Sequence, residues 1–421
     1  MRCFGFLPAT VVQYACFMKE RIGRWIRLAS LVVAFAFVFG RSTTAHAYAW
    51  MIKHEYTSCA TCHADPSGGE LLTKYGRATS DIVLRMHYKK QDGEPETPKT
   101  GVLWGLWDTP DNLLISGSYR SLTVMRPDQA DPVKFIPVMV ADLGGQLTLG
   151  NFMVGGTIGL GRSARGAVHG APAQVTTNED GYNLLSRTHY VGMKLGDSVW
   201  VRGGRLNLPF GVRMPEHTTW VRDATRTDRD SDQQHGVSLA YVGERIRMEA
   251  MAIAGNYQLG PDRYRERGYS LFIEGVGAGN IAAGLSSKVT YAGEDRITGE
   301  VDSVRQAHGM MMRWAPVQSL VVMAEFDALF RSRADAGYVG FTQIDYEPVG
   351  GLHFLLTGEM LDEGLAIQSP APVSAPGQGQ PKFGFWASID WFLYTQLEVR
   401  IDAIARQNEP FTLLGQFHLY L

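Results

Sequence analysis

Apolar and polar residues alternate along the chain from residue 112 onward, in segments of roughly 9 to 15 residues. This alternation is the period of a β-strand that has two different faces. The clearest case is Thr395–Arg406, where alternate positions are apolar (Leu397, Val399, Ile401 and Ala403). The pattern predicts sixteen strands, at residues 112–125, 133–147, 151–161, 187–196, 198–206, 235–243, 245–254, 266–275, 279–291, 303–315, 318–331, 338–347, 351–361, 382–391, 395–406 and 411–421.

The links between the predicted strands alternate in length. After each even-numbered strand the link is only a few residues, such as Asp197 or Pro316–Val317, whereas the other links are mostly long, as at 162–186 and 207–234. Tight turns on one rim and long loops on the other are typical of outer-membrane barrels, but not of soluble sandwiches. A propeller would show a sequence repeat of 40 to 50 residues, and none is visible. We therefore expect an all-β fold, an outer-membrane antiparallel β-barrel of about 16 strands at residues 112–421.

The two faces of the predicted strands fit lipid on one side and a polar lumen on the other. Phe383, Phe385 and Ile389 would face lipid, while Ser388 and Asp390 would face the lumen. Aromatic residues near strand ends suit interfacial girdles; they are Tyr291, Trp314, Phe330, Phe341 and Tyr394. The charged residues assigned to the lumen suit a watery pore, a wall around a plug, or the polar interior of any such barrel, which we favour; they include Arg202, Glu325, Asp327, Glu359, Glu398, Arg400 and Asp402.

The first 47 residues have the features of an export signal. Basic residues precede the apolar run Leu28–Phe39, and the sequence Ala45-His46-Ala47 predicts cleavage before Tyr48. The apolar run is shorter than the roughly 20 residues that a membrane-spanning helix needs. Removal of residues 1–47, which carry six basic residues and one acidic residue, changes the formal net charge from −2 to −7. A mildly acidic exported protein has no basic surface for nucleic acid.

The segment between signal and barrel predicts a small helical unit at residues 48–90 and a linker at 91–111. Apolar residues recur through Gly69–Tyr88, and Gln91–Lys99 (QDGEPETPK) is polar and contains proline. A unit of about forty residues is too small to bury a stable core by itself. We expect it to need a covalent staple or a wall to pack against.

The mature chain keeps two cysteines, Cys59 and Cys62, because Cys3 and Cys16 lie in the signal. With His63 they form Cys-x-x-Cys-His, the spacing of c-type haem attachment, in which two thioethers hold the porphyrin and the histidine binds iron. The alternatives are a redox disulfide or half of a zinc site, although no other cysteine remains to complete a zinc cluster. We predict one covalent haem c, with His63 as the proximal ligand of the iron.

The sequence does not identify the sixth ligand of the iron. His54, Met86 and His87 are candidate distal ligands from the N-terminal unit, and His353 or His418 could reach in from the lumen. A methionine ligand would raise the reduction potential relative to histidine. An iron without a sixth protein ligand would indicate ligand binding or chemistry at the metal, as in a haem enzyme.

The stretch Leu208–His235 has the composition of a cation site at the outer face, because carboxylates and imidazoles gather in it. These residues are Glu216, His217, Asp223, Asp228, Asp230, Asp232 and His235. Several arginines are interspersed with them, and we expect a solvated loop in preference to a metal site.

One Cys-x-x-Cys-His behind an export signal, followed by Tyr75-Gly76-Arg77 and a barrel of about sixteen strands, resembles the fused monohaem cytochrome-porin family of iron-oxidising bacteria. The resemblance covers the mature chain in layout, and its specific motif is Cys59–His63 with the downstream Gly-Arg. It implies that the haem unit plugs the barrel and that electrons pass from an extracellular donor, typically ferrous iron, to periplasmic carriers. The segment Ala64–Gly69 differs from the family at this place.

We therefore predict an outer-membrane cytochrome-porin that carries electrons between an extracellular donor or acceptor and a periplasmic carrier, with its haem unit entering from the periplasmic side. As an enzyme it would be an electron-transferring oxidoreductase, with ferrous-iron oxidation as the implied reaction. The alternative is a porin-like solute channel whose haem unit is a gate, sensor or docking site. The apolar band of such a barrel is roughly 25 Å tall. Electron transfer thus requires a haem well inside the barrel, whereas the channel requires an open lumen.

Overall fold

The computed structural model describes residues 49–54, 58–66, 68–69, 71–84, 100–162, 181–214, 216, 218–278, 280–364 and 380–420. All of them belong to one compact unit, Thr44–Leu421. The predicted export signal and the candidate ligands Met86 and His87 lie outside the described residues. No helix in these described ranges is both long and apolar enough to cross a membrane.

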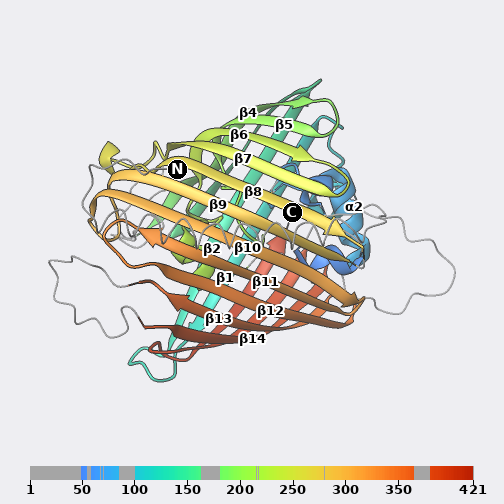
Figure 1. Cartoon of the computed structure of the whole chain (residues 1–421). Helices are drawn as coiled ribbons and strands as arrows, with labels where there is room; N and C mark the ends of the chain where they lie inside the picture. Colours follow the sequence, from blue (N-terminus) through green and yellow to red (C-terminus); the bar gives the residue numbers. More distant parts are fainter. Residues whose placement is uncertain are drawn as a thin grey trace, which may run out of the picture. The chain divides into compact units, whose positions relative to one another are not determined.

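Sixteen strands form one closed antiparallel barrel, in which each strand pairs with its neighbours in sequence and β1 pairs with β16 (Figure 1). The strands are β1 Leu113–Met125, β2 Val133–Leu149, β3 Phe152–Arg162, β4 Tyr182–Leu195, β5 Val199–Leu206, β6 Gln234–Val242, β7 Ile246–Gly255, β8 Arg267–Gly277, β9 Ile281–Glu294, β10 Val301–Val317, β11 Leu320–Arg331, β12 Gly337–Val349, β13 Leu352–Asp362, β14 Lys382–Tyr394, β15 Leu397–Arg406 and β16 Thr412–Tyr420. The predicted fold class and all sixteen predicted strands are confirmed.

The largest error in the predicted strand bounds is at the start of β4, which begins at Tyr182 instead of residue 187. The pairing with β3 shifts between Thr157 and Ile158, so that Arg187 has no partner residue opposite it. Such a bulge breaks the alternation of buried and exposed residues. Residues 182–185 still alternate between exposed and buried, but residues 185–188 are all buried, so the period of two on which the prediction relied is interrupted there.

The two faces of the barrel are as predicted on strand β14. Phe383, Phe385 and Ile389 are 61%, 51% and 43% exposed, whereas Ser388 and Asp390 are buried. In a barrel of this kind the exposed apolar face is the one that meets lipid. The inward-facing residues of the barrel are mostly polar and buried, because other parts of the chain fill the lumen.

Helical segments are short and lie mainly in the N-terminal part of the chain. They are η1 Ala49–His54, η2 Cys59–Thr61, α2 Lys74–Val83, α3 Val102–Gly105, α4 Trp220–Thr225 and η4 Asp262–Tyr264. Helix α2 begins after Thr73, whose side chain accepts a hydrogen bond from the backbone N–H of Gly76 at 3.0 Å, the usual way to satisfy a helix N-terminus. Helix α3 falls within the segment that we predicted to be a linker.

The described part of the N-terminal unit contacts inward-facing residues of the barrel. The ammonium group of Lys53 lies 2.5 Å from the Glu347 carboxylate on β12, and both side chains are buried. Asp65 pairs with Arg202 on β5 at 3.0 Å, and Trp50 is buried. The barrel wall thus supplies the packing surface that so small a unit requires.

A second segment, which we call the inner loop, fills another part of the lumen; it is the link between β5 and β6 at residues 207–233. Phe210 and Val221 are buried at 0% and 1% exposure. Its charged residues pair with the barrel wall, since Glu216 lies 2.7 Å from Arg400 and Arg222 pairs with Glu325. The expectation of a solvated loop is therefore wrong: the lumen charges are a polar wall around buried segments.

Candidate functional site

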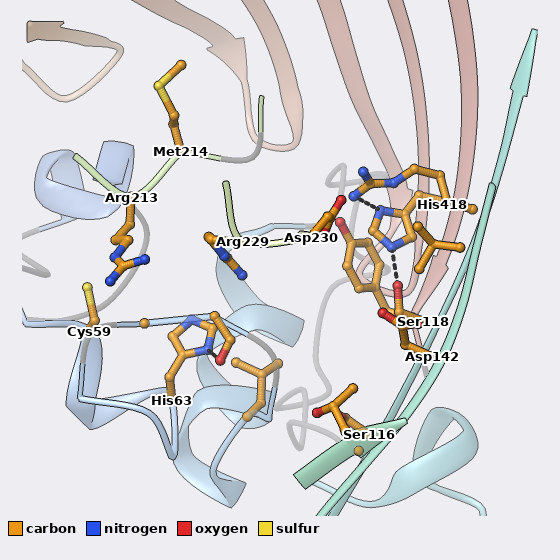
Figure 2. A pocket seen from close by; sticks show the side chains of 18 of the residues that line it. Cys59, His63, Ser116, Ser118, Asp142, Arg213, Met214, Arg229, Asp230 and His418 are labelled. Carbon is orange, nitrogen blue, oxygen red and sulfur yellow. Dashed lines mark hydrogen bonds between the residues drawn. The ribbon is translucent and has the colours of Figure 1, made fainter. Parts of the chain in front are cut away.

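The Cys-x-x-Cys-His motif forms a single tight turn. Cys59 begins η2, and the backbone N–H groups of Cys62 and His63 donate to the carbonyl oxygen of Cys59, at 3.2 and 2.9 Å. Cys59 and His63 are therefore one turn apart, and both side chains line the same cavity (Figure 2). Cys62 is buried behind them and does not line this cavity.

The cavity has a volume of about 210 Å³ and lies inside the barrel. The N-terminal unit, the inner loop and the strands β1, β2, β3 and β16 enclose it. In Figure 2, Cys59 and His63 lie at one side, Arg213 and Arg229 of the inner loop extend into the space, and His418 of β16 stands on the wall. The motif is thus enclosed by segments that are far apart in the sequence.

The imidazole of His63 is held by a hydrogen bond from Nδ1 to the carbonyl oxygen of Gly69, at 3.1 Å. A carbonyl only accepts, so Nδ1 carries the proton and Nε2 is the basic nitrogen of the ring. Burial, and secondly the nearby charge of Arg229, lower the pKa of His63 to about 4. The ring is therefore neutral at ordinary pH, and a bond from its other nitrogen to a carbonyl is the arrangement found in metal-binding histidines.

The two thiols are free in the structure, so they do not form a disulfide. Cys59 Sγ accepts a hydrogen bond from Nη1 of Arg247 at 2.9 Å. Burial, and secondly the neighbouring Cys59, raise the pKa of the Cys62 thiol to about 12. A buried thiol with a raised pKa is largely protonated at neutral pH, so Cys62 is a poor nucleophile for disulfide exchange.

Three glycines allow the chain to pack closely around the motif. Gly68 and Gly69 have φ angles of +88° and +100°, and a Cβ on Gly68 would lie 3.0 Å from Cβ of Cys59. A Cβ on Gly76 would lie 2.3 Å from the carbonyl oxygen of Cys62, so only glycine lets α2 approach the motif. Gly68 thus lies against Cys59, and Gly69 supplies the carbonyl oxygen for His63.

Arg77, which follows Gly76, ties the motif to the barrel. Its guanidinium donates to the carbonyl oxygen of Gly101 at 3.2 Å and to that of Ile115 on β1. It also lines the cavity. The two residues Gly76 and Arg77 therefore have different structural roles: Gly76 contacts the Cys-x-x-Cys-His motif, and Arg77 contacts the barrel wall.

The candidate distal ligands lie in different places. His54 is half-buried, lies 3.7 Å from Glu347 and does not line the cavity. His353 is paired with Asp345 at 2.9 Å, also away from the cavity. His418 does line it, with its ring nitrogens 2.7 Å from Ser118 Oγ and 3.3 Å from Nη2 of Arg120. Which residue supplies the sixth ligand stays a prediction, and the structure adds Met214 of the inner loop to the residues around the cavity.

A zinc or calcium site has no support in the part of the chain that the structure describes. No group of three or more histidine, cysteine or acidic side chains there is arranged to hold a metal ion. In the inner loop, where we considered an outer-face cation site, Asp232 pairs with Arg296 at 3.0 Å and Asp228 accepts from Ser231 at 2.9 Å. These carboxylates are used to fix the loop.

The residues around the cavity fit a haem in chemistry. Cys59 offers a sulfur at the cavity wall, His63 offers Nε2 in the tautomer that binds iron, and arginines face the space in which two carboxylates must be accommodated. The volume of about 210 Å³ is below the roughly 300–1,000 Å³ of most small-molecule sites. The side chains that line it include Arg213 and Arg229, which are long and flexible.

Comparison with known proteins supports the fold. No protein-family model and no curated protein matches the sequence. Solved structures with the same fold include OmpF of Salmonella typhi in complex with daunomycin, at 10% identity and a TM-score of 0.54 over 73% of this chain and 97% of that one. OmpT of Vibrio cholerae, folded in vitro, matches at 8% identity with a TM-score of 0.52, over 74% and 99% of the two chains.

A third structure is the outer-membrane channel DcaP of Acinetobacter baumannii, at 10% identity and a TM-score of 0.51, over 73% of this chain and 97% of that one. OmpT and DcaP are outer-membrane proteins by their descriptions, and the feature shared with all three structures is the barrel. Identities near 10% carry fold but not function. The chain is therefore an outer-membrane β-barrel with a porin-like fold, in a lipid environment.

Proposed function

We propose that this protein is an outer-membrane monohaem cytochrome-porin that carries electrons between an extracellular donor or acceptor and a periplasmic carrier. The observation that carries the proposal is that Cys59 and His63 line one cavity inside the barrel, with His63 already in the iron-binding tautomer. A haem iron alternates between ferric and ferrous states and so takes up and releases one electron at a time.

The residues of the chain have separate roles in this proposal. Cys59 and Cys62 would attach the haem, and His63 would bind its iron. Gly69 fixes the orientation of the His63 ring through its carbonyl oxygen. Burial of the site inside the barrel excludes bulk water, which favours electron transfer over reaction of the iron with solvent molecules.

Contacts of α2 support access of the N-terminal unit from the periplasmic side. Thr395, in the short turn between β14 and β15, donates to the Asp81 carboxylate at 3.2 Å, and Lys74 pairs at 2.5 Å with Asp111, just before β1. Both contacts are at the rim of short turns, and in outer-membrane barrels this rim faces the periplasm. A periplasmic carrier would meet the haem unit there, and the extracellular partner would approach through the long loops. By the resemblance, ferrous iron is the first donor to test.

Covalent haem attachment is tested by expression in cells that mature c-type cytochromes. We expect the purified protein to keep peroxidase-active stain on a denaturing gel and the C59A/C62A variant to lose it. The Ser58→Ala variant, which changes the residue next to the motif and leaves both sulfurs, should stain like wild type. A wild-type protein without stain would remove the electron-transfer proposal.

Electron conduction is tested in liposomes that enclose an acceptor. An impermeant external donor should reduce the acceptor through wild-type protein but not through C59A/C62A protein. Both proteins should be inserted to the same extent, as judged by protease protection. Equal reduction through the two proteins would show that the haem is not the route.

A porin-like solute channel is the second candidate, because the fold resembles that of DcaP, which is an outer-membrane channel. It predicts passage of small solutes through wild-type protein without any donor. Our proposal predicts little passage, because the buried inner loop and N-terminal unit occupy the lumen. Replacement of residues 208–233 by a short Gly-Ser linker should open the barrel and gives the positive control for conductance in a planar bilayer.

A further inference from the structure

Two arginines of the inner loop extend into the cavity that Cys59 and His63 line (Figure 2). Arg213 donates to the carbonyl oxygen of Leu208, and the guanidinium of Arg229 lies against Gly69. Among the described residues, no carboxylate lies within the 4.0 Å ion-pair distance of either guanidinium. Both arginines are therefore partly buried and form no ion pair in that part of the chain, although Asp65 and Glu249 lie near enough for their charges to act on Arg213.

Other buried arginines of the lumen show the arrangement that these two lack. Arg202 lies 2.8 Å from Glu249, Arg313 lies 2.7 Å from Glu274, and Arg400 lies 2.7 Å from Glu216. Enclosing a guanidinium is unfavourable unless an anion compensates its charge. Within the described residues, the contrast indicates that Arg213 and Arg229 can bind the anionic groups of a ligand.

The remaining charges around the cavity leave it positive. Five arginines line it against three aspartates: Arg77, Arg120, Arg213, Arg222 and Arg229 against Asp142, Asp228 and Asp230. Of these, Asp142 is already paired with Arg187 at 3.2 Å, and Arg222 with Glu325. The excess positive charge therefore lies near His63, where the side chains of Arg213 and Arg229 extend into the cavity.

We propose that Arg213 and Arg229 bind the two carboxylate side chains of the haem. This inference rests on the proposed function. Guanidinium groups form paired, charge-assisted hydrogen bonds with carboxylates, and their long stems allow them to follow the edge of a planar ring. The inner loop thereby becomes part of the haem site, although it lies about 150 residues from the motif in sequence.

Two positive charges beside the haem also affect its reduction potential. They stabilise the ferrous form, which has one positive charge fewer than the ferric form, and this raises the potential. Removal of one unit charge that lies about 10 Å from the iron, in the effective dielectric of a protein, changes the equilibrium between the ferric and ferrous forms by roughly tenfold. For a one-electron couple a tenfold change equals about 59 mV.

The first experiment measures the midpoint potential of the purified holoprotein by spectroelectrochemistry. Arg213→Met and Arg229→Met should each lower the midpoint by about 59 mV, a tenfold change, whereas Arg229→Lys, which keeps the charge, should stay near wild type. Arg305→Met is the matched control, because it removes a lumen arginine that does not line the cavity. Midpoints of both methionine variants equal to wild type would overturn the inference.

The second experiment removes the covalent bond and compares two ligands. The C59S/C62S protein should bind haemin in a titration followed by absorbance, and should bind haemin dimethyl ester, which has no free carboxylate, at least tenfold more weakly. In the added background of Arg213→Met and Arg229→Met, the two ligands should bind equally. A preference for haemin that survives in that background would overturn the inference. Wild-type protein without covalent haem would instead remove the proposed function, so the two failures are distinguishable.

Discussion

Asp65 of the N-terminal unit lies 3.0 Å from Nη1 of Arg202 on β5, and the two side chains are only 11% and 1% exposed. Arg202 also lies 2.8 Å from Glu249, so one guanidinium forms ion pairs with Asp65 of the N-terminal unit and with Glu249 of the barrel wall. Two buried carboxylates next to each other would repel without the arginine between them. This arrangement fixes the N-terminal unit against the barrel.

Replacement of Arg202 by methionine should release the N-terminal unit. Breaking a buried ion pair by removal of one partner costs about 3–5 kcal/mol, because Asp65 and Glu249 would remain buried without compensation. We expect the Arg202→Met protein to be cleaved within residues 49–84 at protease concentrations that leave wild type intact. Lys194→Met, at an exposed pair with Asp197, is the control and should leave the cleavage pattern unchanged.

Substitution of Gly76 by alanine should weaken the packing of α2 on the motif. The added Cβ would lie 2.3 Å from the Cys62 carbonyl oxygen, so helix and turn must separate. Overpacking of this kind costs about 1–3 kcal/mol. We expect a reduced yield of covalent haem per barrel, measured by the pyridine haemochrome spectrum. Gly358→Ala, where nothing lies within 4 Å of the added Cβ, should keep the wild-type yield.

Acid should loosen the inner loop through Glu266. Burial alone would raise the pKa of Glu266, but the charges of Arg226 and Lys288 lower it to about 2. A carboxyl with a lowered pKa in the folded state stabilises that state above its ordinary pKa near 4.5, and this stabilisation is lost as the pH falls toward 2. The stabilisation of the folded state that is lost when Glu266 becomes protonated is about 3 kcal/mol.

Hydrogen exchange of residues 218–232 between pH 5 and pH 3 measures this effect. Protection in wild type should decrease with falling pH after correction for the intrinsic exchange rate. In Glu266→Gln protein, the protection should be lower at pH 5 and should change less with pH. Glu409→Gln, at an exposed position, should follow wild type. A pH dependence that is the same in the Glu266 variant would contradict the assignment.

A charge on the lipid face should prevent stable insertion. Ile401 is 53% exposed in the middle of β15. An arginine at the bilayer midplane of such a barrel costs about 2–4 kcal/mol. We expect Ile401→Arg to lower the folded fraction seen as the heat-modifiable band on a gel, while Gln407→Arg, in the loop after β15, folds like wild type.

The barrel could be predicted because lipid and lumen impose opposite requirements on alternate residues, as at Ile401 and Asp402. The start of β4 could not, because the bulge at Arg187 interrupts that alternation. The Cys-x-x-Cys-His motif could be recognised from three residues, because its spacing is short and fixed in sequence. The enclosing cavity was not, because it joins Cys59 to residues of the inner loop and of β16.

The inner loop was misjudged from its composition. Acidic residues and arginines in a long link are typical of solvent-exposed loops, and their partners lie on strands far away in sequence. One signal in the sequence was available: from the end of β5 onward every second residue is apolar, at Leu206, Leu208, Phe210, Val212 and Met214. All five are buried. A solvent-exposed loop does not normally contain such a series of alternating apolar residues, so the series indicates that one side of this segment is buried.

The even number of strands has a topological result. Each strand reverses direction, so β1 starts and β16 finishes at the same rim, where the two pair side by side. The tether that leads from the N-terminal unit into β1 and the last residues of β16 must then reach one compartment. An epitope fused after β16 would therefore be accessible from the same side of the membrane as the connection to Cys59 and His63, whichever way the barrel is inserted.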